Sequence, residues 1–431
     1  VEPGLLVVGG FARDALIGKH PKDADVEVYG VSVERLEDFL DQLYGNQVNK
    51  VGQAFGIFKV ALGDGLDLDV SIPRRESKIG TGHRGFEVQG DPGMSVIEAA
   101  RRRDFTFNAL AADPLTGVYE DHFGGIEDLK SRTLRVTDAE RFQDDPLRVY
   151  RALQFVARMN LHTDEQSFDL MKEMVERGDL DQLTAERITE EWKKLLLKSE
   201  RPATGLNLGK QLGIVDRYFP ELNSADSWNA VGQSIDRAAR VIHQKGRTLS
   251  ENERLQVMLC ALCSEMDHQG KGVQKFLAKT SFSKKEIIAP IAGLIKEQSE
   301  PTRIWKMFEA GELSEKQVAN EIRKVVKRIH PASPETLLAV NEAKERHETP
   351  TMQDDETYPP VILLREYLLR HPEWLDPKKD ALINGDDLKA LGIPAGPEMG
   401  KVMRMVEDAR DRGEIETHEE ALAWFVATNK K

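Results

Sequence analysis

Two short stretches of the 431-residue chain carry aspartates at every second position. DADVEVY contains Asp23 and Asp25, and LDLDVSI contains Asp67 and Asp69. This alternation is typical of a β-strand, in which residues i and i+2 point to the same face, so each pair of carboxylates projects together. Neighbouring carboxylates repel each other unless a cation lies between them, and Mg²⁺ is commonly held by one or two carboxylates plus substrate phosphates. The spacing indicates a metal site for phosphoryl transfer, with a solvated strand face as the alternative.

A pair of glycines precedes the first aspartates. VVGGFARD runs from an apolar strand into Gly9 and Gly10 and then into the start of a helix. Glycines let the backbone approach a ligand closely, and the first turn of a helix presents N–H groups to an anion. The stretch is neither a Walker loop nor a GxGxxG motif. We therefore expect one site with a phosphate at the glycines and a metal at the aspartates.

The elements that must position these groups change character along the chain. Strand-like alternation is mixed with short helical stretches in the first part, whereas later segments show mostly the spacing of amphipathic helices. The segment 347–360, rich in Pro, Asp and Glu, is predicted to be a linker. We predict four parts, namely a catalytic head at 1–135, a helical neck at 136–200, a helical body at 201–346 and a helical tail at 361–431.

The composition narrows the possible classes of protein. The chain is 40% hydrophobic and 31% charged, and no apolar run approaches the ~18 residues of a membrane span, so we expect no membrane association. Cys260 and Cys263 lie in the apolar stretch VMLCALC and are expected to be buried helix residues; low cysteine use fits a cytoplasmic protein. The net charge of −13 argues against a protein whose whole surface binds nucleic acid. It is compatible with a local basic groove, because exposed charges act over about 10 Å.

Several longer motifs point to one family. VVGGFARDALIGKHPKDADVEVYG resembles the signature of class II tRNA nucleotidyltransferases, the CCA-adding enzymes and their bacterial poly(A) polymerase relatives. Further stretches agree with the family in order and spacing: RRRDFTFNALA (101–111), EDHFGGIEDLKSRTLR (120–135), DDPLRVYRALQF (144–155), LTAERITEEWKKLL (183–196) and, near the end, LINGDDLKALGIPAGPEMGKVM. The resemblance implies an α+β head of the polymerase-β-type nucleotidyltransferase fold, a small mixed sheet with helices, followed by an all-α neck, body and tail.

The resemblance also implies roles for particular residues. The catalytic carboxylates, which would bind two Mg²⁺ ions, are Asp23, Asp25 and Asp69. The residues that would hold the nucleotide and its triphosphate are Gly9, Gly10, Arg13, Arg103, Asp104 and Asn108. The residues that would read the base, from one face of a helix, are Asp145, Arg148 and Arg151.

The implied activity is the template-independent addition of C and A nucleotides, from CTP and ATP, to the 3′ acceptor end of tRNA. An A-adding enzyme acting on tRNA that ends in CC and a poly(A) polymerase remain open. The segment PRRESKIGTGHRGFEV (73–88) resembles the flexible loop that CC-only members lack, with the polar residues Arg74, Glu76, Lys78 and Arg84. From other classes, a non-catalytic RNA-binding protein and a small-molecule nucleotidyltransferase are the competing hypotheses.

The chain also departs from the family pattern. Asp144 replaces a glutamate, Gln154 replaces the arginine usually found before a phenylalanine, and His122 replaces a proline. In CALCSEMDHQGKG (260–272), Ser264 and Glu265 stand where many relatives carry the His and Asp of a phosphohydrolase metal centre. We therefore expect a helical body that lacks this second metal centre.

Overall fold

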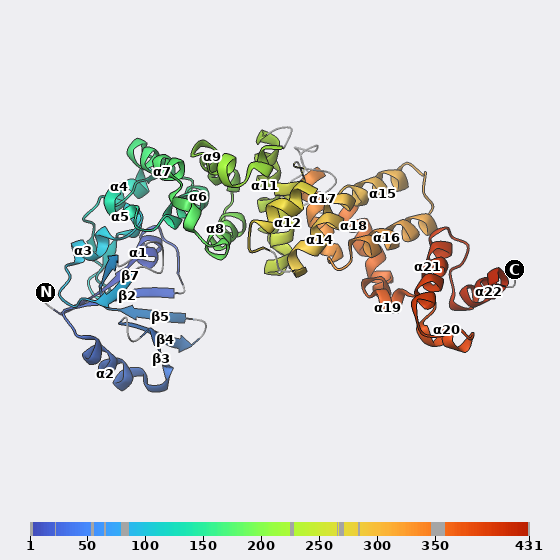
Figure 1. The fold of residues 1–431 in the computed structure, drawn as a ribbon, viewed down its shortest axis with the longest axis horizontal. Coiled ribbons are helices and arrows are strands. Elements are labelled where there is room, and N and C mark those ends of the chain that lie inside the picture. The colour runs from blue at the N-terminus through green and yellow to red at the C-terminus, as the bar shows by residue number, and fades with distance from the viewer. Residues whose placement is uncertain are drawn as a thin grey trace. The chain divides into compact units, whose positions relative to one another are not determined.

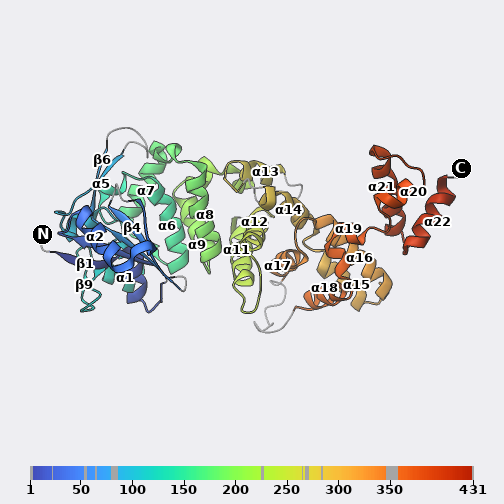
Figure 2. The same ribbon diagram turned by 90° about the horizontal axis from the view of Figure 1, so that it is seen from below.

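The computed structural model describes residues 3–21, 23–52, 56–63, 66–78, 86–224, 228–264, 266, 271–282, 285–345 and 358–429. The chain folds into two compact units, Val1–Phe219 and Pro220–Lys431, and each is described here by itself (Figure 1). Among the described residues the strands lie in the first unit, and the second unit is helical in both views (Figures 1 and 2).

A mixed seven-stranded sheet forms the base of the first unit. Its strand order is β3-β4-β5-β2-β1-β8-β9. Strands β2 and β5 run parallel, and the other neighbouring pairs run antiparallel. The strands are β1 (Gly4–Val8), β2 (Asp23–Tyr29), β3 (Val48–Gly52), β4 (Ile57–Gly63), β5 (Leu66–Ser71), β8 (Ala111–Ala112) and β9 (Tyr119–Glu120).

The apolar half of the strand alternation decides which face of the sheet is buried. Helix α2 (Val33–Tyr44) begins at Ser32, whose Oγ accepts the Arg35 N–H, and packs against the sheet. The buried residues of this core come from α2, β2, β4, β5 and the residue after β5: Val26, Val28, Leu36, Leu40, Phe58, Val60, Val70 and Ile72. Because residues i and i+2 share a face, this packing leaves the acidic residues of β2 and β5 on the opposite face.

A second pair of strands occupies the segment that the sequence predicts to be a flexible loop. Strands β6 (Arg74–Lys78) and β7 (Phe86–Gly90) pair antiparallel, with Arg74 opposite Gly90 and Lys78 opposite Phe86. The ends of the predicted loop are therefore strands, since backbone hydrogen bonds join them locally. Arg84 lies outside the described residues, as do the side chains of Glu76 and Lys78.

Helices complete the first unit. They are α1 (Gly9–Leu16), α3 (Val96–Arg101), α4 (Gly125–Lys130), α5 (Ala139–Phe142), α6 (Leu147–Met159), α7 (Glu165–Arg177), α8 (Ala185–Lys198), α9 (Pro202–Gln211) and α10 (Ile214–Tyr218), with a small parallel pair, β10 (Thr133–Leu134) and β11 (His162–Thr163). Phe105 precedes the 3₁₀ turn Thr106–Asn108 and Phe107 lies within it. Both rings pack on Phe155 of α6, with ring centroids 5.7 and 5.4 Å away. This aromatic contact fixes the turn against α6.

The second unit consists of helices. They are α11 (Trp228–Ile242), α12 (Glu251–Cys263), α13 (Lys271–Ala278), α14 (Lys285–Glu297), α15 (Glu300–Glu309), α16 (Glu315–Ile329), α17 (Pro334–Glu345), α18 (Pro359–Arg370), α19 (Pro377–Asp380), α20 (Gly385–Ala390), α21 (Pro397–Asp411) and α22 (His418–Asn429). Cys260 and Cys263 are buried free thiols in α12, as predicted. Across the described ranges, no helix combines the length and apolar character that crossing a membrane requires.

Two sequence-based predictions about the later chain stay predictions. The boundaries of head, neck, body and tail are not tested by the division into two units. Most of the predicted linker, residues 347–357, lies outside the described part of the chain. Glu265, which stands where relatives carry a residue of the phosphohydrolase metal centre, also lies outside it, as do Asp267 and His268 of the same segment.

Candidate active site

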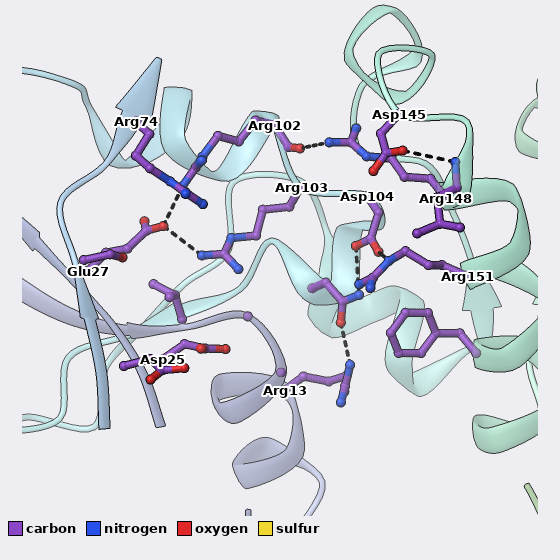
Figure 3. A pocket seen from close by; sticks show the side chains of 18 of the residues that line it. Arg13, Asp25, Glu27, Arg74, Arg102, Arg103, Asp104, Asp145, Arg148 and Arg151 are labelled. Carbon is purple, nitrogen blue, oxygen red and sulfur yellow. Dashed lines mark hydrogen bonds and ion pairs between the residues drawn. The ribbon is translucent and has the colours of Figure 1, made fainter. Parts of the chain in front are cut away.

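A cavity of about 630 Å³ opens on the acidic face of the sheet in the first unit (Figure 3). Among the described residues, eight arginines line it: Arg13, Arg74, Arg102, Arg103, Arg148, Arg151, Arg158 and Arg187. Five carboxylates line it as well: Asp25, Glu27, Asp69, Asp104 and Asp145. The excess of arginines gives a positive cavity in an acidic chain, which suits a polyanionic ligand.

The carboxylates of β2 and β5 meet at one end of the cavity. In the parallel ladder Asp25 is the register partner of Asp69, and Asp23 is the partner of Asp67. Burial raises the pKa of Asp25 above its ordinary value, the nearby charges of Asp69, Glu27 and Asp23 add to the rise, and Arg103 opposes it. Asp25 and Asp69 line the cavity, whereas Asp23 lies beyond the lining residues.

Asp69 also faces Lys59, its antiparallel neighbour on β4. The Lys59 ammonium lies 3.0 Å from Asp67 and 3.9 Å from Asp69, whose side chain is 44% exposed. Within the described ranges, no three His, Cys, Asp or Glu side chains converge closely enough to hold a metal ion as they stand. The strand register and the accumulated negative charge fit a divalent cation.

Helix α1 begins at the first glycine of the pair, two positions earlier than the sequence predicts, because both glycines belong to the helix. Gly9 has φ +64°, and a Cβ built there would lie 2.5 Å from Arg103 Nη1. The Gly9 N–H donates to the Leu110 carbonyl at 3.1 Å. The N–H groups of the next residues in the first turn have no acceptor within the helix, so they are the ones that can donate to a ligand. Gly10 lines the cavity, and the first turn of α1 contains no acidic residue, which favours an anion there.

Asp104 is the centre of a buried hydrogen-bond chain. Its carboxylate accepts from Arg151 Nε at 2.6 Å and from Asn108 Nδ2 at 2.9 Å, and Asn108 Oδ1 accepts from Arg13 Nη1 at 2.5 Å. Burial opposes ionisation, but the Arg151 charge and these hydrogen bonds hold the pKa of Asp104 below its ordinary value. This series of hydrogen bonds links α6, the 3₁₀ turn and α1, and it fixes Arg13 and Arg151 at the cavity wall.

Asp145 and Arg148 both line the cavity, each held by a distant part of the chain. Asp145 accepts from Arg187 Nη2 at 3.0 and 3.2 Å, and Arg148 donates to the backbone carbonyls of Arg102 and Arg141 at 2.6 and 2.7 Å (Figure 3). The expectation that Asp145 and Arg148 share a helix face is wrong in detail. Helix α6 begins at Leu147, and Asp145 precedes it because the residue before a proline disfavours helical backbone.

Sequence reasoning missed several residues of the cavity. Glu27 continues the alternation of Asp23 and Asp25, so the same period-two pattern could have found it. Arg158 lies seven residues after Arg151 on α6, on the same face, and helical periodicity could have found it too. Arg102 is adjacent to the predicted Arg103, but no local pattern in the sequence indicated that Arg187 would reach Asp145.

Residues 5–135 match the model described as "Poly A polymerase head domain", and residues 160–226 match "Probable RNA and SrmB- binding site of polymerase A". A multifunctional CCA protein of Stenotrophomonas maltophilia is 35% identical over 223 residues, which is 51% of this chain and 52% of the relative. One of Nitrosospira multiformis is 32% identical over 269 residues, 62% of this chain and 61% of the relative. The matches thus span between half and two thirds of these curated relatives.

Residues 5–135 and 160–226 of this chain are therefore similar to the head and RNA-binding regions of poly(A) polymerases, and about half of the chain is similar to multifunctional CCA proteins. Solved structures of CCA-adding enzymes share the fold of this chain. The Bacillus stearothermophilus CCA-adding enzyme in complex with CTP is 21% identical, with a TM-score of 0.67 over 100% of this chain and 94% of that one. The Thermotoga maritima CCA-adding enzyme complexed with tRNA is 23% identical, with a TM-score of 0.60 over 99% and 91%. The predicted fold class, a polymerase-type head followed by helices, is confirmed.

One departure of this chain from the motifs that it resembles has a structural consequence. Gln154, which replaces an arginine of the motif, is 1% exposed and accepts from Arg158 Nη1 at 2.8 Å. The guanidinium groups of Arg13, Arg151 and Arg158 each lie 5.3–5.7 Å from the Phe155 ring centroid. The Phe155 ring thus lies close to three arginines at one wall of the cavity, at distances that allow cation–π contacts.

Proposed function

We propose that this chain is a template-independent nucleotidyltransferase that adds C and A nucleotides from CTP and ATP to the 3′ end of tRNA. The observation that carries the proposal is a single cavity that joins register-paired aspartates, an arginine-rich wall and the pair Asp145 and Arg148. The tRNA 3′-oxygen forms a bond to the α-phosphorus while the bond from that phosphorus to the bridging oxygen of the β-phosphate breaks. Pyrophosphate leaves with the electron pair of that bond.

The carboxylates of β2 and β5 form the metal end of the proposed site. Asp23, Asp25 and Asp69 would hold divalent cations, which we propose to be two Mg²⁺ ions, the usual partners of carboxylates and phosphates. Bound there, such ions polarise the attacking and leaving oxygens of a phosphoryl transfer. The raised pKa of Asp25 and its like-charged neighbours support this assignment, because a cation would relieve the repulsion.

The arginine wall would bind the triphosphate. Arg103 lies between Gly9 and Glu27, and Arg13 is held by Asn108, so both guanidinium groups are fixed before a ligand arrives. Fixed guanidinium forks bind phosphate oxygens with little loss of side-chain entropy. Asp104 and Asn108 serve by holding Arg151 and Arg13, and Gly10 brings the first turn of α1 close to the phosphates.

Asp145 and Arg148 would select the base. Cytosine and adenine both present an amino group beside a ring nitrogen acceptor, so a carboxylate accepting from the amine and a guanidinium donating to the nitrogen match either base. Guanine and uracil present a carbonyl at the amine position, which leaves Asp145 facing an acceptor. A buried polar group left unsatisfied costs about 1–3 kcal/mol, or roughly 10–100-fold in affinity. The contacts from Arg187 and the two backbone carbonyls support a rigid reading pair.

The partners follow from this chemistry and from the relatives. The acceptor end of tRNA would supply the attacking hydroxyl, in keeping with the names of the multifunctional CCA proteins and the CCA-adding enzymes. An A-adding enzyme and a poly(A) polymerase use the same site chemistry and are outcomes of the test. The cytoplasmic location remains a prediction from the sequence.

The test incubates the purified chain with tRNAs that end before the CCA tail, after one C and after CC, each with CTP, ATP or both. Extension of all three to full CCA supports the proposal, whereas extension of the CC-ended tRNA alone identifies an A-adding enzyme. Long A-tails on unrelated RNA identify a poly(A) polymerase. Asp25→Asn should abolish extension, while Asp38→Asn, an exposed carboxylate of α2, should not change it. Incorporation of GTP as readily as ATP would refute the base-reading pair.

A further inference from the structure

Glu27 is a buried carboxylate of the candidate site that binds no reacting group in the proposed chemistry but contacts two of the arginines that line the cavity. It follows Asp25 by two residues on the same face of β2, and it is only 3% exposed. Its Oε1 accepts from Arg102 Nη2 and from Arg103 Nη2, both at 2.9 Å (Figure 3). Its Oε2 accepts from the Tyr29 hydroxyl at 2.8 Å. Both carboxylate oxygens are therefore engaged by side chains of the protein.

The partners of Glu27 suit a charged carboxylate. Two guanidinium groups and a tyrosine hydroxyl donate to its two oxygens, and hydrogen bonds between charged groups are stronger than those between neutral ones. A buried carboxylate without partners is strongly destabilising, so the two arginines and Glu27 stabilise one another. The two guanidinium groups share a single oxygen atom, and without the carboxylate their like charges would drive them apart.

Both arginines take part in the walls of the cavity. Arg103 Nη1 lies 2.5 Å from the position that a Cβ on Gly9 would occupy, so this guanidinium lies directly beside the glycine that begins α1. The backbone carbonyl of Arg102 accepts from Arg148 Nη2 at 2.6 Å. Glu27 thus connects the strand of Asp25 to the residues beside the helix start and, through Arg102, to Arg148.

We propose that Glu27 is a positioning residue for the triphosphate, acting by holding the Arg102 and Arg103 guanidinium groups at the cavity wall. A guanidinium has five N–H donors, and the hydrogen bond from Arg103 Nη2 to Glu27 uses one of them, so the anchored group can still donate to phosphate oxygens. The side chains of Arg102 and Arg103 are 22% and 23% exposed, which gives them a route into water once the anchor is removed. This inference rests on the proposed function, since it assumes that the cavity binds a nucleoside triphosphate.

The first experiment measures equilibrium binding of ATP, without tRNA, to the full chain and to Glu27→Gln. The substitution keeps the shape but removes the charge that holds the two guanidinium groups together. We expect the Kd for ATP to rise about tenfold, and the inhibition constant of pyrophosphate to rise by a similar factor, because the effect falls on the phosphates. The kcat of nucleotide addition at saturating ATP should stay within about threefold, since the reacting groups are untouched.

Two matched variants separate positioning from general destabilisation. Glu342→Gln removes a 5%-exposed carboxylate that pairs with Arg247 in the second unit, and it should leave ATP binding unchanged. Tyr29→Phe removes the hydrogen bond to Oε2 but keeps both arginine contacts, so its Kd should stay within about twofold. If Glu27→Gln does not fold, Glu27→Asp carries the test, because the shorter side chain keeps the charge but not the reach to both arginines.

A double-mutant cycle decides whether Glu27 acts through the arginines. In an Arg102→Ala, Arg103→Ala background, adding Glu27→Gln should change ATP binding less than twofold. An undiminished effect in that background, or tighter ATP binding by Glu27→Gln alone, would overturn the proposal; tighter binding would mean that the carboxylate competes with phosphate for the arginines. If the wild-type chain binds ATP but does not extend tRNA, the proposed function is refuted. The role of Glu27 is then still decided by the ATP-binding measurements on the variants.

Discussion

Replacing Gly9 by alanine tests whether the glycine is needed for the close approach of Arg103. Two effects follow from the structure. Gly9 has φ +64°, a conformation that costs an L-residue about 1–2 kcal/mol. In addition, the new Cβ would lie 2.5 Å from Arg103 Nη1, where ordinary contacts begin near 3.4 Å, so the guanidinium must move by roughly 1 Å. A misplacement of this size can cost about 100-fold in rate, equivalent to ~2.7 kcal/mol.

Gly18→Ala is the matched control for this prediction. Gly18 also has a positive φ, +75°, but a Cβ there would meet nothing within 4 Å. Both variants should therefore lose similar stability in urea or thermal unfolding, because both carry the backbone strain. Only Gly9→Ala should also lose about 100-fold in kcat/KM for nucleotide addition to tRNA. Equal activities of the two variants, or an equal loss in both, would show that the approach of Arg103 to Gly9 has no part in catalysis.

Further substitutions probe other parts of the chain. Asp25→Asn should lower nucleotide addition by about three orders of magnitude and weaken Mn²⁺ binding followed by electron paramagnetic resonance, because the metal end of the site loses a charged ligand; unchanged Mn²⁺ affinity would contradict the assignment. Arg187→Met should remove the nitrogen that donates to both oxygens of Asp145 and reduce the preference for ATP and CTP over GTP and UTP by about tenfold, measured as kcat/KM ratios, with preserved selectivity as the contrary result. Burial raises the pKa of Cys260 and raises that of Cys263 to about 12, so the thiolate fraction at pH 8 is small and both thiols should react with Ellman's reagent only after unfolding in urea; rapid reaction of the native chain would contradict their burial.

Local patterns in the sequence predicted which carboxylates share a strand face. Period-two alternation indicated that Asp23 and Asp25 share a strand face, and the burial of Val26 and Val28 in the opposite core explains why that face carries the carboxylates. The same reasoning failed at Asp145. Its spacing from Arg148 suggested a common helix face, but the helix begins after Pro146 and does not include Asp145. It also described 73–88 as a loop, although strand pairing extends into both ends of that segment.

The sequence by itself determined which residue types face the same way, since strand and helix periods depend only on neighbouring residues. The tertiary structure decided which of these faces meet. The bond from Arg187 to Asp145 spans 42 positions, and the bond from Arg102 to Glu27 spans 75. No local period relates residues so far apart, because their meeting depends on how the sheet, the 3₁₀ turn and the helices pack together. The carboxylates were therefore readable in the sequence, but the partners that hold the arginines in place were not.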